Sequence, residues 1–206
     1  MEPITLREIA EATAGRLVCG EATTTVGSVS TDSRSVAPGS LFIPIVGMRF
    51  DAHVFIPQAL QAGAAATLFA RTAGVLPPRE GSKGWIEVED TLAALQQLAA
   101  WYRSRFDIPV VGVTGSVGKT STKEMVADAL SPVFSVLRTK GNFNNEIGMP
   151  MTLLTLEPSH RAAVIEMGTS SPGEIPLLSS LARPTHAVVT NIGISHIEFF
   201  GSREAI

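Results

Sequence analysis

The fold is decided at residues 110–121, which read VVGVTGSVGKTS. The first four residues form an unalternated apolar run, which is typical of a strand buried on both faces of a parallel sheet. Similar runs follow at 162–165 and 187–189. Between the runs we expect helices at 119–130, 151–156 and 174–181. These elements predict a doubly wound α/β domain with a parallel sheet.

Residues 115–121 read as a phosphate-binding loop that opens a helix. Its glycines let the backbone approach phosphate, and the N–H groups of the helix N-terminus receive the negative charge. Lys119 would reach the β- and γ-phosphates of ATP, and the Thr120 hydroxyl would ligate Mg²⁺. The strict pattern G-x-x-x-x-G-K-[ST] has glycine where this chain has Val113, and Gly115 takes that role two positions later. The alternative is a glycine-rich turn with a chance lysine.

Polar residues follow the other two apolar runs at the points where ligands of such a sheet gather. Glu166 comes directly after the second run, and Asn191 and His196 follow the third. We therefore expect a phosphate loop, a carboxylate and a histidine at one edge of the sheet. Glu166 is predicted to hold Mg²⁺, an ion that prefers oxygen ligands, and His196 is assigned to the same site.

Residues 140–150 read KGNFNNEIGMP, a segment too rich in asparagine and glycine for a helix. One interpretation is a solvated loop that closes on itself through bonds from side chains to backbone. The other is a polar loop that lines a substrate groove beside the nucleotide, and we favour it.

The first half of the chain predicts a small mixed α/β domain over residues 1–106, with the second domain at 107–206. Thr5 and Glu8 have capping-box spacing at the start of a short helix. Asp90 begins a long helix with one apolar stripe. The other expected elements are strands near 17–18, 29, 41–43, 66–70 and 85–88, a helix at 54–62 and a loop at 72–84.

Residues 30–34, with the sequence STDSR, combine hydroxyls, a carboxylate and a guanidinium. They fit a turn capped by the side chain of Asp32. They also fit recognition of a phosphate or a base, for which arginine and hydroxyl groups are suited. The residues alone leave both interpretations open.

Composition excludes several other classes of protein. The net charge of −3 over 206 residues argues against a basic face that binds nucleic acid. The single cysteine, Cys19, forms no internal disulfide and fits a reducing compartment. The first residues show no signal peptide, and the uncharged stretch 52–70 contains His53 and Pro57, so it is a poor membrane span. We expect a cytoplasmic protein without membrane insertion.

Taken together, these motifs resemble the Mur ligase family over essentially the whole chain. The similarity is to the branch that adds D-alanyl-D-alanine, and the upstream segments are similar to its UDP-sugar-binding domain. The matching segments are, in order, 31–34 (TDSR), 51–55 (DAHVF), 115–125 (GSVGKTSTKEM), 141–150 (GNFNNEIGMP), 166–168 (EMG) and 191–202, which contains His196.

The resemblance implies an ATP-dependent amide ligase of peptidoglycan precursor synthesis. ATP would phosphorylate the C-terminal carboxylate of UDP-MurNAc-tripeptide, and the amine of D-alanyl-D-alanine would attack the acyl phosphate. Carried onto this sequence, the implied catalytic residues are Lys119, Glu166 and His196, with Thr120 and Glu166 on one Mg²⁺ and His196 on a second. The implied ATP-binding residues are Thr114, Gly115, Ser116, Val117, Gly118, Lys119, Thr120, Ser121 and Asn191. The implied substrate-binding residues are Thr31, Asp32, Ser33 and Arg34 near the uridine diphosphate, and Asn144 and Asn145 in the groove.

The resemblance also implies further sequence, with a lysine that becomes carbamoylated, the rest of the central domain and a C-terminal domain. We therefore expect the chain to be an N-terminal part, inactive by itself, of an enzyme that is a monomer. The alternatives are another amide ligase of the superfamily, a UDP-sugar-binding module without catalysis, and a P-loop kinase or NTPase. The last explains the asparagine segment and the first domain poorly.

Overall fold

The computed structural model describes residues 1–47 and 50–202. The chain divides into two compact units, Met1–Trp101 and a second that starts at Tyr102. Helix α3 (Thr91–Ser104) contains this division, and the boundary predicted at residues 106 and 107 lies just beyond the helix. That boundary stays a prediction, and the units are described separately.

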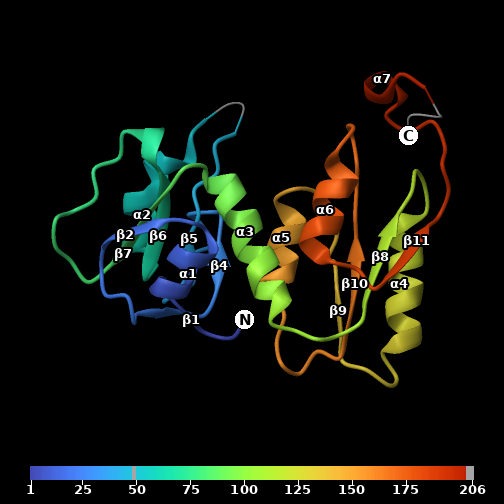
Figure 1. Cartoon of the computed structure of the whole chain (residues 1–206), viewed down its shortest axis with the longest axis horizontal. Coiled ribbons are helices and arrows are strands. Elements are labelled where there is room, and N and C mark those ends of the chain that lie inside the picture. The colour runs from blue at the N-terminus through green and yellow to red at the C-terminus, as the bar shows by residue number, and fades with distance from the viewer. Residues whose placement is uncertain (48–49, 203–206) are drawn as a thin grey trace. The chain divides into compact units, whose positions relative to one another are not determined.

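The first unit contains a five-stranded sheet with the order β2-β7-β6-β5-β4 (Figure 1). Four of its strands are parallel, and β2 is antiparallel to β7. A separate antiparallel pair, β1 and β3, was not predicted, since each strand has only two residues. The strands are β1 (Ile4–Thr5), β2 (Arg16–Cys19), β3 (Thr25–Val26), β4 (Val29–Ser30), β5 (Leu41–Phe42), β6 (Ala66–Ala70) and β7 (Gly84–Val88).

Local sequence signals explain where the helices of this unit begin. The N–H of Glu8 donates to Thr5 Oγ1 at 3.2 Å and the N–H of Thr5 donates to Glu8 Oε2 at 2.8 Å, so the capping box is present. The helix expected at 54–62 is split, because Pro57 occupies the first turn of its α-helical part. The helices are α1 (Leu6–Ala12), η1 (Ala52–Phe55), α2 (Ile56–Gln61), η2 (Arg71–Ala73) and α3.

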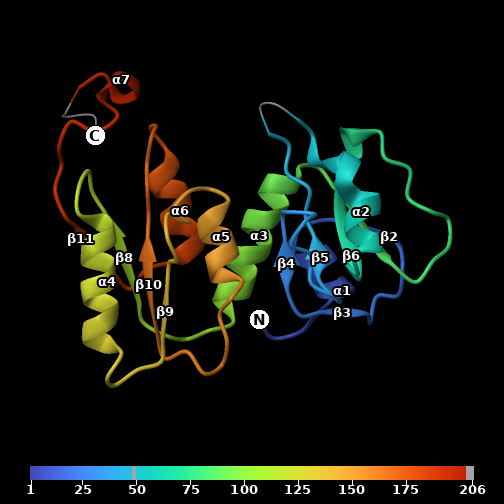
Figure 2. The ribbon, with the colours of Figure 1, turned by 180° about the vertical axis from the view of Figure 1, so that it is seen from behind.

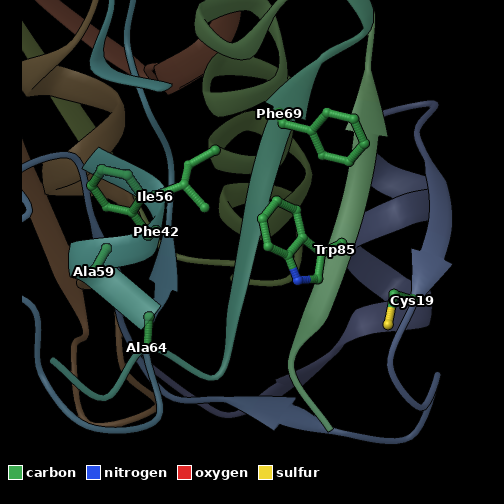
Figure 3. Packing of buried hydrophobic residues seen from close by; sticks show 7 residues of the cluster. All are labelled: Cys19, Phe42, Ile56, Ala59, Ala64, Phe69 and Trp85. Atoms are coloured by element: carbon green, nitrogen blue, oxygen red, sulfur yellow. The ribbon is translucent and has the colours of Figure 1, made fainter. Parts of the chain in front are cut away.

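The core of the first unit gathers apolar side chains from both the sheet and α2 (Figure 3). Phe69 and Trp85, on neighbouring strands, meet edge to face with ring centroids 5.9 Å apart. The buried residues of this cluster are Cys19, Phe42, Ile56, Ala59, Ala64, Phe69 and Trp85.

The second unit contains a four-stranded parallel sheet with the order β11-β8-β10-β9. Helix α4 covers one side of it, and α5 and α6 lie on the other (Figures 1 and 2). This confirms the predicted doubly wound parallel fold. The elements are β8 (Val110–Thr114), α4 (Lys119–Leu130), β9 (Val136–Arg138), α5 (Gly148–Leu153), β10 (Ala162–Glu166), α6 (Glu174–Ala182), β11 (His186–Val189) and α7 (Ile197–Phe200).

Three details of the second unit differ from the expectation. Strand β9 was missed because it has only three residues and ends on Arg138, so it forms no apolar run. Strand β11 is not buried on both faces: it pairs with β8 at one edge of the described sheet, and Val189 is 57% exposed. Helix α5 was expected at 151–156 but covers Gly148–Leu153. The N–H of Gly148 at its start donates to Asn145 Oδ1 at 2.8 Å.

Within residues 1–47 and 50–202, no helix combines the length and the apolar character needed to cross a membrane.

Candidate nucleotide and metal site

The loop between β8 and α4 has a backbone that requires glycine. Gly115 has φ +133° and Gly118 has φ +84°, a region that residues with a Cβ rarely adopt. At Gly115 a Cβ would also lie 2.1 Å from Thr190 Oγ1, whereas at Gly118 it would meet no atom within 4 Å. Gly115 is therefore required both for its backbone conformation and for the close approach of the segment after β11.

The segment after β11 holds the loop through several hydrogen bonds. The N–H of Ser116 donates to the backbone oxygen of Asn191 at 3.1 Å. The N–H of Val117 donates to Oδ1 of the same asparagine, also at 3.1 Å. Thr190 Oγ1 donates to the Val117 carbonyl at 2.7 Å. Asn191 was predicted to bind ATP, and in the structure its side chain accepts a hydrogen bond from the loop itself.

Helix α4 starts in a way that suits an anion. Its N-cap, Gly118, has no side chain to accept hydrogen bonds from the first-turn N–H groups, which have no partners within the helix. The Lys119 ammonium donates to the Gly115 carbonyl at 2.6 Å and so lies over the loop. Thr120 and Ser121 are exposed in the same first turn. Amide donors and a lysine around a glycine loop are the arrangement that binds phosphate.

Glu166 ends β10 with a side chain that is almost completely buried. Its Oε2 accepts a hydrogen bond from Thr120 Oγ1 at 3.0 Å, and its Oε1 accepts one from Asn144 Nδ2 at 2.8 Å. Its backbone N–H donates to Thr139 Oγ1 at 3.0 Å. The two residues predicted to hold one Mg²⁺, Thr120 and Glu166, are thus in direct contact.

Lys123 belongs to the same cluster, although the sequence did not mark it as functional. Its side chain is fully buried, and Nζ lies 3.8 Å from Glu166 Oε2. The same ammonium lies 2.8 Å from Glu124 Oε1 and donates to the Thr139 carbonyl at 2.7 Å. The signal that points to it is helical spacing, since it follows Thr120 by three positions and shares its face of α4.

Two adjoining pockets bring most of the other predicted residues together. A polar pocket of about 330 Å³ is bordered by Lys119, Asn144, Asn145 and His196, among others. A second pocket, of about 250 Å³, has Lys119 and His196 in common with the first. It is also lined by Thr114, Gly115, Ser116 and Asn191. The asparagine segment thus contacts both the carboxylate and the start of α5. Asn144 donates to Glu166, and Asn145 accepts from the Gly148 N–H and borders the polar pocket.

The donor set fits Mg²⁺ in part. A hydroxyl and a carboxylate are hard oxygen ligands, and Mg²⁺ commonly binds through one or two such groups together with phosphate and water. Across the described parts of the chain, no three His, Cys, Asp or Glu side chains converge closely enough to hold a metal ion. His196, at the N-cap of α7, borders the pockets, and its place on a second Mg²⁺ stays a prediction.

The loop before α6 borders the polar pocket and is fixed by Glu174. Partial burial raises the pKa of this carboxyl, but hydrogen bonds from the N–H groups and hydroxyls of Ser170 and Ser171 outweigh burial and lower the pKa to about 2. The folded pKa therefore lies below the unfolded value of about 4.3. This stabilisation is complete above pH ~5 and is lost as the pH falls toward about 2.

Glu174→Gln should therefore lower the free energy of unfolding by about 1 kcal/mol at pH 7, the usual scale for a hydrogen-bonded carboxylate in the first turn of a helix. The difference between the two proteins should shrink as the pH falls from 5 to 2, because protonation removes the same interaction from the parent chain. Urea unfolding at several pH values measures this. A difference that stays constant over that range would contradict the assignment.

The first unit contains a pocket at the segment predicted to bind UDP. Its volume is about 580 Å³. Asp32 and Arg34 form a bidentate pair, with Arg34 Nε 2.9 Å from Asp32 Oδ1 and Nη2 2.7 Å from Oδ2. Hydrogen bonds from the side chain and backbone N–H of Arg34 lower the pKa of Asp32 to about 2. The lining includes Thr31, Asp32, Ser33, Arg34, Phe42, Phe50 and Phe55.

The structure contains features of both interpretations of residues 30–34, the capped turn and the ligand site. The backbone N–H of Arg34 donates to Asp32 Oδ1 at 2.9 Å, which is the capped turn. The same residues line a pocket with aromatic walls, which is the geometry of a ligand site.

Comparison with known proteins identifies the family. Residues 25–103 match the family described as Mur ligase family, catalytic domain, and residues 113–206 match the Mur ligase middle domain. The chain belongs to the Mur ligase family. The resemblance inferred from the motifs is confirmed.

Several similar relatives within this family share a name. The chain is 48% identical, over 88% of its length, to UDP-N-acetylmuramoyl-tripeptide–D-alanyl-D-alanine ligase of Synechocystis. It matches a crystal structure of MurF from Acinetobacter baumannii over its whole length, with a TM-score of 0.89 and 36% identity. It also matches a MurF ligase from Thermotoga maritima in complex with ADP, over 86% of its length, with a TM-score of 0.76 and 39% identity.

The chain spans between 39% and 44% of the length of these three proteins. The comparisons therefore establish the fold and the family of this chain. They do not establish the activity of a whole enzyme.

Proposed function

We propose that this Mur ligase chain serves ATP-dependent amide formation, joining D-alanyl-D-alanine to UDP-MurNAc-tripeptide in peptidoglycan precursor synthesis. The observation that carries the proposal is the contact between Thr120 and Glu166 beside the glycine loop. It is supported by the name of the Synechocystis relative and by the ADP complex of the Thermotoga protein.

The proposed reaction has two steps. A carboxylate oxygen of the tripeptide attacks the γ-phosphorus of ATP, so that ADP leaves and an acyl phosphate forms. The amine of D-alanyl-D-alanine then attacks the acyl carbon, phosphate leaves, and the amine loses a proton. Both the attacking carboxylate and the γ-phosphate are negative, so the site must offset their repulsion.

This chain supplies residues for that task. Lys119 and the N–H groups of the first turn of α4 bind the phosphates and stabilise the charge that develops on them. Thr120 and Glu166 would hold Mg²⁺, which when bound supplies further positive charge to the phosphate oxygens. His196 borders the same pockets and is assigned to the second metal position. The polar pocket beside Asn144 and Asn145 would take the peptide carboxylate.

We assign the pocket of the first unit to the uridine diphosphate, and we place the reaction in the cytoplasm, where ATP is available. Arg34→Ala should weaken UDP binding about fivefold, because an exposed guanidinium that already pairs with Asp32 makes only a modest contribution to a phosphate contact. Saturation-transfer NMR with UDP at millimolar concentration measures the change.

The matched control is Arg16→Ala, which removes another exposed arginine of the same unit that pairs with a carboxylate, Glu87. Equal UDP affinity in all three proteins would remove the pocket from the proposal.

An assay on the protein as its gene encodes it tests the activity itself. Phosphate release from ATP should require both UDP-MurNAc-tripeptide and D-alanyl-D-alanine, and single amino acids should not replace the dipeptide. Release that depends on another amine would assign the chain to a different Mur ligase reaction. Binding of the UDP compound without turnover would leave a module without catalysis.

A further inference from the structure

Lys123 is a fully buried charged residue to which the proposed reaction gives no task. A lysine is almost never fully buried without a partner, and the side chain of Lys123 has 0% exposure. Its ammonium makes three polar contacts, to Glu166, Glu124 and the Thr139 carbonyl. One of these partners is the carboxylate assigned to the metal.

The buried carboxylate of Glu166 needs a nearby positive charge, and Lys123 supplies one. A carboxylate removed from water is costly unless it is paired and hydrogen-bonded. Thr120 and Asn144 donate neutral hydrogen bonds to it, one to each oxygen. The Lys123 ammonium, 3.8 Å from Oε2, supplies the opposite charge.

The contacts of Lys123 also fix the position of Glu166 between three elements. Lys123 projects from α4, and its bond to the Thr139 carbonyl reaches the residue that follows β9. Thr139 Oγ1 in turn accepts the backbone N–H of Glu166 at the end of β10. The lysine therefore ties the carboxylate to the helix that carries Thr120.

Glu124 offers the competing explanation. Its side chain is 43% exposed and also pairs with Arg138 at 2.8 Å. If Lys123 serves only the fold, through Glu124 and Thr139, then its charge is unrelated to Glu166.

We propose that Lys123 is a positioning residue that holds the Glu166 carboxylate for the divalent cation of the nucleotide, through the same oxygen that the Thr120 hydroxyl contacts. This rests on the proposed nucleotide site. Lys123 acts through Glu166, whereas Lys119 lies over the loop itself.

The test compares ADP affinity with and without Mg²⁺, by NMR titration of the chain. In the parent chain, Mg²⁺ should tighten ADP binding. Lys123→Met should reduce this gain about tenfold, the lower end of the effect of removing a residue that orients a metal ligand. Affinity for ADP in the presence of EDTA should be unchanged, and Glu124→Gln should behave like the parent.

Each outcome has a separate meaning. No ADP binding by the parent chain contradicts the proposed nucleotide site and this inference with it. If Mg²⁺ tightens ADP binding equally in the parent and in Lys123→Met, the inference about Lys123 is wrong, but the proposed nucleotide site is not contradicted. A parallel loss of affinity with and without Mg²⁺, or the same loss in Glu124→Gln, assigns Lys123 to the fold and also overturns it.

A second substitution keeps the test decisive if Lys123→Met does not fold. Adding Glu166→Gln removes the buried charge that the lysine balances, and this should restore folding. Restoration by Glu124→Gln instead, or by neither substitution, would contradict the pairing with Glu166.

Discussion

Lys119→Ala is expected to lower the rate of acyl-phosphate formation at least ~10²-fold, the scale for the loss of one charge partner in a transition state. The ammonium lies over the loop, 2.6 Å from the Gly115 carbonyl, beside the N-terminus of α4. Removal leaves the attacking carboxylate and the γ-phosphate without the cation that offsets their repulsion. Transfer of ³²P from ATP, measured with UDP-MurNAc-tripeptide on the protein as its gene encodes it, reports the rate.

Lys83→Ala is the control for this substitution. That lysine donates to the Ala64 carbonyl in the first unit, so the substitution removes the same charge from a residue outside the loop and its helix. The control should keep the parent rate. Near-normal rates in Lys119→Ala would remove the lysine from the phosphate site.

Gly115→Ala is expected to destabilise the second unit by about 3 kcal/mol, through backbone strain and a steric clash together. Its φ is +133°, and the new Cβ would lie 2.1 Å from Thr190 Oγ1 and 3.0 Å from backbone atoms of Asn191. Thermal unfolding followed by amide NMR signals of the second unit measures the loss.

Gly118→Ala separates the two causes. Its φ is also positive, +84°, and no atom lies within 4 Å of the added Cβ, so only the left-handed conformation costs energy, about 1 kcal/mol. Equal losses at the two positions would show that the contact with Thr190 is unimportant.

The sequence predicted those helices and strands whose apolar residues follow a clear pattern. Helix α4 has the predicted bounds, and the apolar runs of β8 and β10 were found because each is buried on both faces. Strand β9 has no run to detect, and its pairing with β10 comes from tertiary contact. The glycine loop after β8 was predicted from Gly115 and Gly118 although Val113 breaks the strict pattern, and both glycines have positive φ angles in the structure. Its binding of phosphate stays a prediction.

The candidate site shows where sequence reasoning stops. Motif spacing identified Thr120 and Glu166, but their contact depends on how α4 lies over the end of β10. The same packing buries Lys123 beside Glu166 and turns Asn144 toward that carboxylate. The sequence does not show how closely a helix and a strand pack. A charged residue on a helix is therefore predicted to face solvent until the packing of that helix on the sheet is known.

Binding of Mn²⁺·ADP followed by paramagnetic broadening of backbone amide signals tests the central claim, that the loop after β8 holds a nucleotide with its cation at Thr120 and Glu166. The account predicts that broadening is strongest at Gly118, Lys119, Thr120 and Glu166. Broadening centred elsewhere, or none at millimolar Mn²⁺·ADP, would contradict it.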